Sequence, residues 1–222
     1  MSQQALDKPT TASSDASERI LTAAEALFAE HGFDAVSINA IAKRAGVSKA
    51  NVFHHFNSKD ELYIAVLRAA CRDAADNLHH LQHDDRPFHT RLADFAREHI
   101  NHILAQHKVT RLIQREMLYN EPGRAQDIAE KVFGDIFQRL VQILRDGQTR
   151  GELRADVDPA MVATLLIGAD VFFFQARGLL QHFPDVTFTK EPERYSRMMI
   201  DMLLHGILPR TATANKNSPP GA

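Results

Sequence analysis

The sequence predicts an all-α protein, and three observations support this. Apolar residues recur at three- and four-residue spacing along most of the chain, which is the period of an amphipathic helix. Serine, aspartate and proline stand where several of these segments begin, as they do at helix N-caps and in first turns. No segment alternates apolar and polar residues with the two-residue period of a strand. We therefore expect an N-terminal three-helix unit followed by a C-terminal antiparallel helical bundle, with about nine helices in all.

The first helix is expected to begin only after a loose arm. Residues 1–16 are polar and lack helical periodicity, so we expect them to be disordered. From residue 17 or 18 to His31 the chain carries an apolar stripe at helical spacing, made of Ile20, Ala24, Leu27 and Phe28. Gly32 should end this helix.

Two short helices joined at a glycine follow. Ser37 can cap the first and Ser48 the second, because a serine hydroxyl accepts a free N–H of the opening turn. The first of them has an apolar face made of Ile38, Ile41, Ala42 and Ala45. Gly46 stands where a sharp turn needs a residue that tolerates φ > 0. Residues 37–56 are therefore predicted to form a helix-turn-helix, a motif that lays its second helix in the DNA major groove.

The rest of the chain predicts longer helices. Ser58 and Glu61 match a capping box, which should open a helix over 59–81 that links the N-terminal unit to the body. A polar stretch from His79 to Pro87 indicates a loop. The further helices are expected over 88–106, 110–119, 124–150, 159–180 and 192–209. Residues 210–222 are expected to be a second disordered tail.

Composition suits a cytoplasmic globular protein. The chain has 222 residues, no apolar run near the roughly 18 that a membrane span needs, and no N-terminal apolar segment of a signal peptide. Its single cysteine, Cys71, excludes an internal disulfide and fits a reducing compartment. The net charge of −2 does not suggest a nucleic-acid partner, but residues 37–60 carry four bases against one acid. This basic segment on a slightly acidic body suits a protein that contacts DNA with one small surface.

Three segments around the motif resemble the TetR family of transcriptional regulators. They are the stretch from Ile20 to Phe33, Gly46-Val47-Ser48 with Val52 to Phe56, and Ser58 to Leu62. Within that family, residues 46–68 are most similar to the pyrimidine-utilisation repressor branch. The resemblance implies a DNA-binding domain over 17–62 and a ligand-binding and dimerisation domain over 82–209. It also implies a homodimeric repressor that a small-molecule effector releases from a palindromic DNA operator, with no cofactor and no membrane partner.

The resemblance also indicates which side chains meet DNA. Base readers are expected at Asn39, Lys49, Ala50 and His54. Phosphate contacts are expected at Ser37, Lys43, Asn51, Phe53, His55 and Lys59. Lys43, like its neighbour Arg44, could equally lie on a solvated face. Phe53 departs from the family, which usually has a tyrosine there, because phenylalanine keeps the packing but has no hydroxyl for a phosphate.

The C-terminal body holds two further candidate surfaces. The helix after Asp158 is apolar nearly all round, more than one monomer's core should need, and an unusually apolar internal core is the alternative to a dimer interface. Dimer contacts are expected at Leu165, Gly168, Ala169, Phe172, Met198 and Met202. Candidates for an effector pocket among the middle helices are Phe95, His99, Gln114, Met117, Phe133, Phe137, Asp170 and Phe174. Their mix of aromatic and few polar groups suits a small, largely apolar or planar ligand.

A metal-responsive regulator and an enzyme are two other classes of function to compare with the sequence. His79 with His83, and His99 with His102, have spacings that could place each pair on one helix face, so a metal-responsive regulator is the alternative. No further ligand spacing completes either pair. An enzyme is not expected, because no phosphate-binding glycine loop, Gly-x-Ser-x-Gly motif or cysteine with a partnered base occurs.

Overall fold

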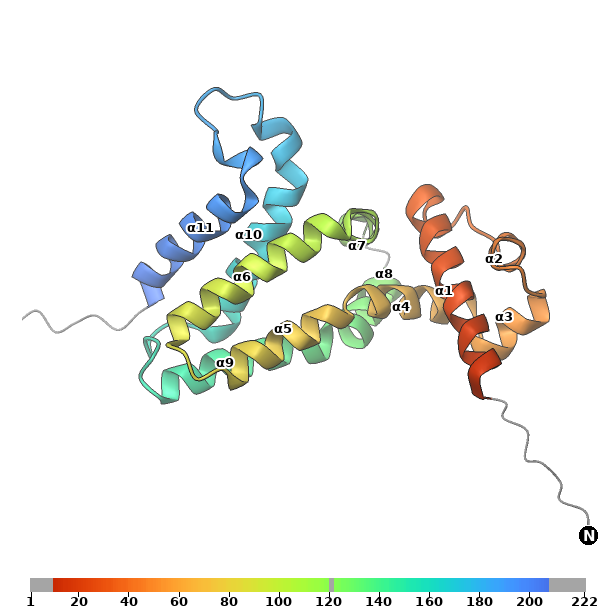
Figure 1. Ribbon diagram of the computed structural model, residues 1–222, viewed down its shortest axis with the longest axis horizontal. Coiled ribbons are helices and arrows are strands. Elements are labelled where there is room, and N and C mark those ends of the chain that lie inside the picture. Colours follow the sequence, from red (N-terminus) through yellow and green to blue (C-terminus); the bar gives the residue numbers. More distant parts are fainter. Residues whose placement is uncertain (1–9, 120–121, 208–222) are drawn as a thin grey trace, which may run out of the picture. The chain divides into compact units, whose positions relative to one another are not determined.

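Helices make up nearly all of the regular structure. The computed structural model describes residues 10–119 and 122–207, which form eleven α-helices, a π-helical turn η1 and a 3₁₀ turn η2 (Figure 1). In order these are α1 (Thr10–His31), α2 (Ile38–Ala45), α3 (Lys49–His55), α4 (Lys59–Ala70), α5 (Arg72–His83), α6 (Phe88–Ala105), α7 (His107–Tyr119), α8 (Pro122–Ile128), η1 (Ala129–Phe133), α9 (Gly134–Thr149), α10 (Pro159–Leu180), η2 (Phe188–Lys190) and α11 (Pro192–Ile207). The predicted all-α class is confirmed.

Two predicted helices are each broken, which accounts for eleven helices where about nine were expected. The helix expected over 59–81 is interrupted at Cys71, where φ and ψ of −91° and 5° leave the helical region. α5 then continues to His83, so the loop expected from His79 is limited to residues 84–87. The helix expected over 124–150 is interrupted by η1. A Cβ at Gly134, the residue after η1, would lie 3.3 Å from the carbonyl oxygen of Ala129, so glycine accommodates the wider turn.

The first helix is longer than expected. α1 begins at Thr10, so residues 10–16 are helical, although the sequence predicted a disordered arm there. The remainder of that arm, residues 1–9, and the tail predicted at 210–222 lie outside the described residues. Residues 10–16 contain neither glycine nor proline, so nothing in them breaks the helix, although their serine, threonine and aspartate are weak helix formers.

The chain folds into two compact units that do not follow the linear division of the sequence. Of the described residues, the first unit contains 10–73, 104–119 and 122–135, so the N-terminal helices α1–α4 pack with α7, α8 and η1. Its buried core is centred on Phe28, Ile41, Tyr63 and Leu67, and it includes Val109 and Leu112 of α7. The segment from α7 to η1 therefore belongs structurally to the N-terminal helices, although the sequence placed it in the C-terminal domain.

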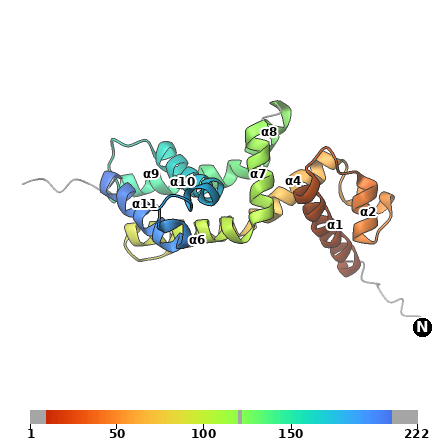
Figure 2. The same ribbon diagram turned by 90° about the horizontal axis from the view of Figure 1, so that it is seen from above.

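Of the described residues, the second unit contains 74–103 and 136–207. Its helices α5, α6, α9, α10 and α11 share one core that includes Leu92, Leu144, Leu166 and Ile200. Figure 2 shows α6, α9, α10 and α11 of this unit seen from above.

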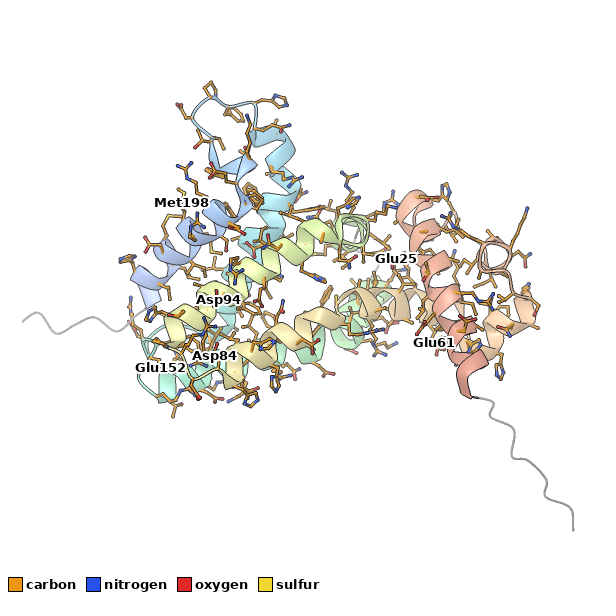
Figure 3. The ribbon with its side chains drawn as sticks, in the orientation of Figure 1. Glu25, Glu61, Asp84, Asp94, Glu152 and Met198 are labelled. Carbon is orange, nitrogen blue, oxygen red and sulfur yellow. The ribbon has the colours of Figure 1, made fainter. Side chains whose placement is uncertain are left out.

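A buried arginine fixes the corner where α5 ends and α6 begins. Arg91 is 7% exposed, donates from Nη1 to the carbonyl of Leu81 at 2.6 Å, and lies 3.6 Å from the carboxylate of Glu152. Nearby, Arg86 pairs with Asp84 and with Asp94. Asp84, Asp94 and Glu152 gather at one end of this unit in Figure 3. Arg91 thereby satisfies a carbonyl at the C-terminal end of α5 that the helix cannot satisfy itself.

α10 has two distinct apolar faces. One face is buried and holds Val162, Ala163, Leu166, Asp170 and Phe173. The other is exposed and carries large apolar side chains at helical spacing: Met161, Leu165, Phe172 and Leu179. By length and composition alone α10 could cross a membrane, and it is the single helix of the described residues with that property. An exposed apolar face on a helix that already has a buried one is typical of a surface that meets another protein or a membrane.

The turn between α2 and α3 generates a prediction about stability. Gly46 has a φ of +66°, and the nearest atom to an added Cβ would be the Arg19 guanidinium at 3.8 Å. Because there is space, Gly46→Ala should cost only the left-handed backbone strain, about 1–2 kcal/mol of unfolding free energy, measured by chemical denaturation.

Gly178→Ala is the matched control, since Gly178 lies in α10 and an added Cβ would meet nothing within 4 Å. It should leave stability unchanged or raise it. Equal losses in both variants would contradict the proposed strain at Gly46.

Candidate nucleic-acid interface

The predicted helix-turn-helix is formed, and its two serine caps lie where the sequence placed them. The Ser37 hydroxyl accepts the backbone N–H of Ala40 at 3.2 Å, and the Ser48 hydroxyl accepts that of Asn51 at 3.1 Å. Between them Gly46 adopts the left-handed conformation, and its own N–H bonds back to the end of α2. These local contacts fix the angle at which α3 leaves the turn.

Burial separates the two faces of the motif. Ile41, Ala42, Ala45 and Val52 are buried in the core of the first unit. All four predicted base readers are solvent-exposed: Asn39, Lys49, Ala50 and His54. The core face therefore holds α2 and α3 in place, while the opposite face is free to meet a partner.

The predicted phosphate contacts lie in more varied surroundings. Ser37 and Lys43 are exposed, whereas Asn51 and His55 are half-buried. The side-chain oxygen of Asn51 is buried and finds no hydrogen-bond partner within the described residues. The His54 and His55 rings meet edge to face with centroids 5.2 Å apart. Either imidazole can donate to an acceptor on DNA.

Phe53 lies on the exposed side of α3, with 42% of its surface accessible. The Lys49 ammonium is 5.9 Å from the centroid of its ring, at the outer limit of a cation–π contact. Phenylalanine has no hydrogen-bonding group, so a phosphate contact at this position could only be made through van der Waals packing.

Lys59 is the predicted phosphate contact with the most partners inside the protein. Its ammonium donates to the carbonyl oxygen of Asp34 at 3.4 Å and lies 4.2 Å from the centroid of the Phe33 ring. Sequence reasoning missed the residues behind this arrangement, which include Glu116 and Arg124. No local pattern in the sequence marks them, because they lie more than fifty residues beyond the motif.

The positive charges of the motif are unequally neutralised. Arg44 pairs with Glu30 at 3.4 Å, and Arg19 donates to the carbonyl of Ala45 at 3.3 Å. Within residues 10–119 and 122–207, no ion pair engages Lys43 or Lys49. These two lysines therefore offer the exposed positive charge on α2 and α3.

The predicted effector candidates are divided between the two units. Gln114, Met117 and Phe133 lie in the first unit, and Met117 is 64% exposed. The second unit holds Phe95, His99, Phe137, Asp170 and Phe174. The structure brings three of these together: Phe95 stacks on His99 with ring centroids 6.0 Å apart, and His99 Nδ1 lies 2.7 Å from Asp170.

Asp170 is an unusual residue for the middle of an apolar helix. It is fully buried, and its second carboxylate oxygen has no hydrogen-bond partner in the described part of the chain. Burial raises the pKa of this carboxyl, while the hydrogen bond and charge of His99 oppose the shift. A buried acceptor with spare capacity can bind a ligand's hydrogen-bond donor.

The predicted dimer residues lie on α10 and α11. Five of the six are exposed: Leu165, Gly168, Phe172, Met198 and Met202. Ala169 is half-buried instead, and its carbonyl accepts the hydroxyl of Tyr195 at 2.6 Å. Figure 3 shows Met198 on α11.

The histidine pairs do not extend to larger groups. In the first pair, the ring centroids of His79 and His83 lie 4.5 Å apart. In the second pair, Nδ1 of His99 lies within hydrogen-bond distance of the Asp170 carboxylate. Among the described residues, no group of three or more histidine, cysteine or acidic side chains is placed to hold a metal ion. Burial raises the pKa of the Cys71 thiol to about 11, so the nucleophilic thiolate is scarce near neutral pH.

Both the N-terminal and the C-terminal parts of the chain match known protein families. Residues 20–66 match the family described as "Bacterial regulatory proteins, tetR family", and residues 89–203 match the family described as "Tetracyclin repressor-like, C-terminal domain". The regulator UidR of Escherichia coli K12 is 29% identical over 166 residues, covering 73% of this chain and 81% of UidR. RutR of the same organism is 46% identical over 61 residues, which cover only 28% of this chain and 29% of RutR.

A solved structure shows the same fold. The flavonoid-responsive regulator FrrA superposes with a TM-score of 0.65 and 27% identity, covering 89% of this chain and all of that chain. The likeness therefore spans both the N-terminal and the C-terminal helices.

Because Lys49 is exposed on α3, its replacement is expected to reduce the ability of the protein to discriminate between DNA sequences. Lys49→Ala should narrow the gap in binding free energy between a DNA duplex selected from a random pool and an unselected duplex by about 1–3 kcal/mol, measured by fluorescence anisotropy.

Lys43→Ala is the control, because it removes an equal positive charge at a predicted phosphate contact. It should weaken binding to both duplexes alike and reduce the slope of log K against log salt by about 0.9. An equal loss on both duplexes for Lys49→Ala would show that Lys49 contacts the DNA backbone alone.

Proposed function

Because this chain belongs to the TetR family of bacterial regulatory proteins, we propose that it acts as a homodimeric repressor that a small-molecule effector releases from a palindromic DNA operator. As a member of this family it is a DNA-binding transcriptional regulator and not an enzyme. The observation that carries the proposal is the exposed face of α2 and α3, where Asn39, Lys49, Ala50 and His54 project from a buried support.

The chemistry of this face suits base recognition. An ammonium group such as that of Lys49 donates to O6 or N7 of guanine, and an asparagine such as Asn39 pairs with adenine. A small side chain such as Ala50 can contact the methyl group of thymine. Ser37, Lys43, Asn51 and His55 flank these positions and would fix the register of the motif on the phosphates. Lys59 and Phe53 complete the proposed backbone contacts.

The second part of the proposal is the dimer. Leu165, Gly168 and Phe172 follow one another at three- and then four-residue spacing on the exposed face of α10, and Met198 and Met202 lie four residues apart on α11. A second copy of the chain would bury both stripes, and a two-fold axis would relate its helix-turn-helix to the first. Two equivalent motifs read two equivalent half-sites, which is why the operator is proposed to be palindromic.

The third part is the effector. Phe95, His99 and Asp170 combine aromatic rings with one buried acceptor, an arrangement that suits a largely apolar ligand bearing a hydrogen-bond donor. FrrA is by its title flavonoid-responsive, and a planar polyphenol would have this chemistry. Such a ligand releases DNA if it prefers the conformation that does not fit the operator, with a typical coupling of about 1–3 kcal/mol. The proposed site of action is the cytoplasm, with no cofactor and no membrane partner.

Selection of bound duplexes from a random pool by the full chain tests the proposal. We expect an inverted repeat whose half-sites are separated by about one DNA turn or a multiple of it. Recovery of duplexes without any shared sequence would contradict sequence-specific binding.

The apolar stripe on α10 predicts that one charge abolishes the dimer. Phe172 is 61% exposed, so Phe172→Glu should leave the fold of the unit intact and place a carboxylate in the proposed interface. The variant should sediment as a monomer, and its affinity for the full inverted repeat should fall by about 10²-fold or more because the second half-site no longer adds to binding.

Leu118→Glu, at a 70% exposed leucine of α7, introduces the same charge on a helix that carries neither stripe and should leave the dimer intact. A dimeric Phe172→Glu variant would place the interface elsewhere.

A further inference from the structure

The turn that leads into the helix-turn-helix is held by residues from α7 and α8. Gly32, Phe33 and Asp34 lie between the end of α1 and Ser37, the cap of α2. α7 packs against α1 and α4, and η1 packs against α4. Within this unit, two charged side chains bring the α7–α8 segment to the turn: Glu116 of α7 and Arg124 of α8.

Glu116 is the buried anchor of this arrangement. It is 8% exposed, accepts the hydroxyl of Tyr63 at 3.0 Å, and pairs with Arg124 at 3.4 Å. Burial and then the charge of Glu116 raise the pKa of Tyr63 far above its ordinary value, so the phenol keeps its proton and remains a donor. Glu116 thus binds α4, through Tyr63, and α8, through Arg124.

Arg124, which is paired with Glu116, also contacts Phe33 and Asp34. Its guanidinium carbon lies 4.1 Å from the centroid of the Phe33 ring, and its Nη2 lies 3.7 Å from the carboxylate of Asp34. The Phe33 ring is packed by Tyr63 at 4.9 Å and by Phe28 at 5.8 Å between centroids. The arginine is therefore one wall of the site in which the Phe33 side chain is held.

Lys59 depends on the same two residues. Its ammonium contacts the Phe33 ring and the Asp34 carbonyl, so the proposed phosphate contact and Arg124 share both partners. A lysine side chain has four rotatable bonds, and these contacts limit where its charge can be. Displacement of Phe33 or Asp34 would remove that restraint.

Gly32 lies close to the end of the Arg115 side chain of α7. It has a φ of +80°, and an added Cβ would collide with the Arg115 guanidinium. Glycine is favoured here by the left-handed backbone conformation, whereas the flexible end of the Arg115 side chain could move aside.

We propose that Arg124 is a positioning residue for DNA binding: by holding Phe33 and Asp34 it fixes the Lys59 ammonium at a DNA phosphate. This inference rests on the proposed function, since it requires that Lys59 contacts DNA. If Arg124 has this role, residues of the α7–α8 segment that do not contact DNA still influence the affinity for DNA.

The experiment compares Arg124→Met and Lys59→Ala, singly and combined, in the full chain. Methionine retains an apolar stem against Phe33 and removes the cation. Affinity for a duplex selected by the wild-type protein is measured over a series of salt concentrations. The control is Arg111→Met, which removes an equal charge from an exposed position of α7.

We expect Arg124→Met to weaken binding by about the same factor as Lys59→Ala and to reduce the salt slope by about 0.9, the loss of one phosphate contact. The combined variant should bind no more weakly than Lys59→Ala alone, because both changes remove the same contact. Arg111→Met should keep the wild-type slope.

Three results would overturn the inference: independent, multiplicative losses in the combined variant, an unchanged salt slope in Arg124→Met, or an unchanged slope in Lys59→Ala. If Arg124→Met unfolds because Glu116 is left unpaired, the paired variant Glu116→Gln/Arg124→Met is measured instead, since it buries no lone charge. It should show the same reduced slope. A wild-type chain that binds no duplex would refute the proposed function rather than the role of Arg124.

Discussion

The arrangement of the N-terminal helices depends on one backbone constraint, the left-handed turn at Gly46 between two serine-capped helices. Helices as short as α2 and α3 have little intrinsic stability, so their position comes from the caps and from burial of one face. That burial leaves Lys49, Ala50 and His54 on the other face. The caps and the buried face of α2 and α3 therefore determine which side chains the motif exposes. The membership of the chain in the TetR family agrees with that geometry.

The helix-turn-helix was predictable from sequence because its determinants are local. Serine caps, a glycine at the turn and apolar residues three and four apart all lie within residues 37–56. The faces of α10 were predictable for the same reason, since its excess of apolar residues is visible in the sequence. The helix breaks at Cys71 and at η1 were not, because neither position carries a proline or a glycine pair to mark a break.

The role of the α7–α8 segment could not be predicted at all. Glu116 and Arg124 read as ordinary surface charges in the sequence, and only the fold brings them to Tyr63, Phe33 and Asp34. Long-range pairs of this kind carry no periodic signal. The His99–Asp170 pair is intermediate. Both residues were candidates for the effector pocket, but their contact depends on how α6 and α10 pack. The sequence pattern can therefore single out candidate residues, but only the packing of the helices shows which of them contact one another.

We propose that two copies of this chain present two identical basic motifs to one duplex. The most direct test is the mass of the complex, measured by analytical ultracentrifugation of the full chain with its selected duplex and with a duplex containing half of the repeat. The account predicts two chains on the full repeat and markedly weaker binding to the half-site. A single chain bound to the full repeat, with equal affinity for the half-site, would contradict it.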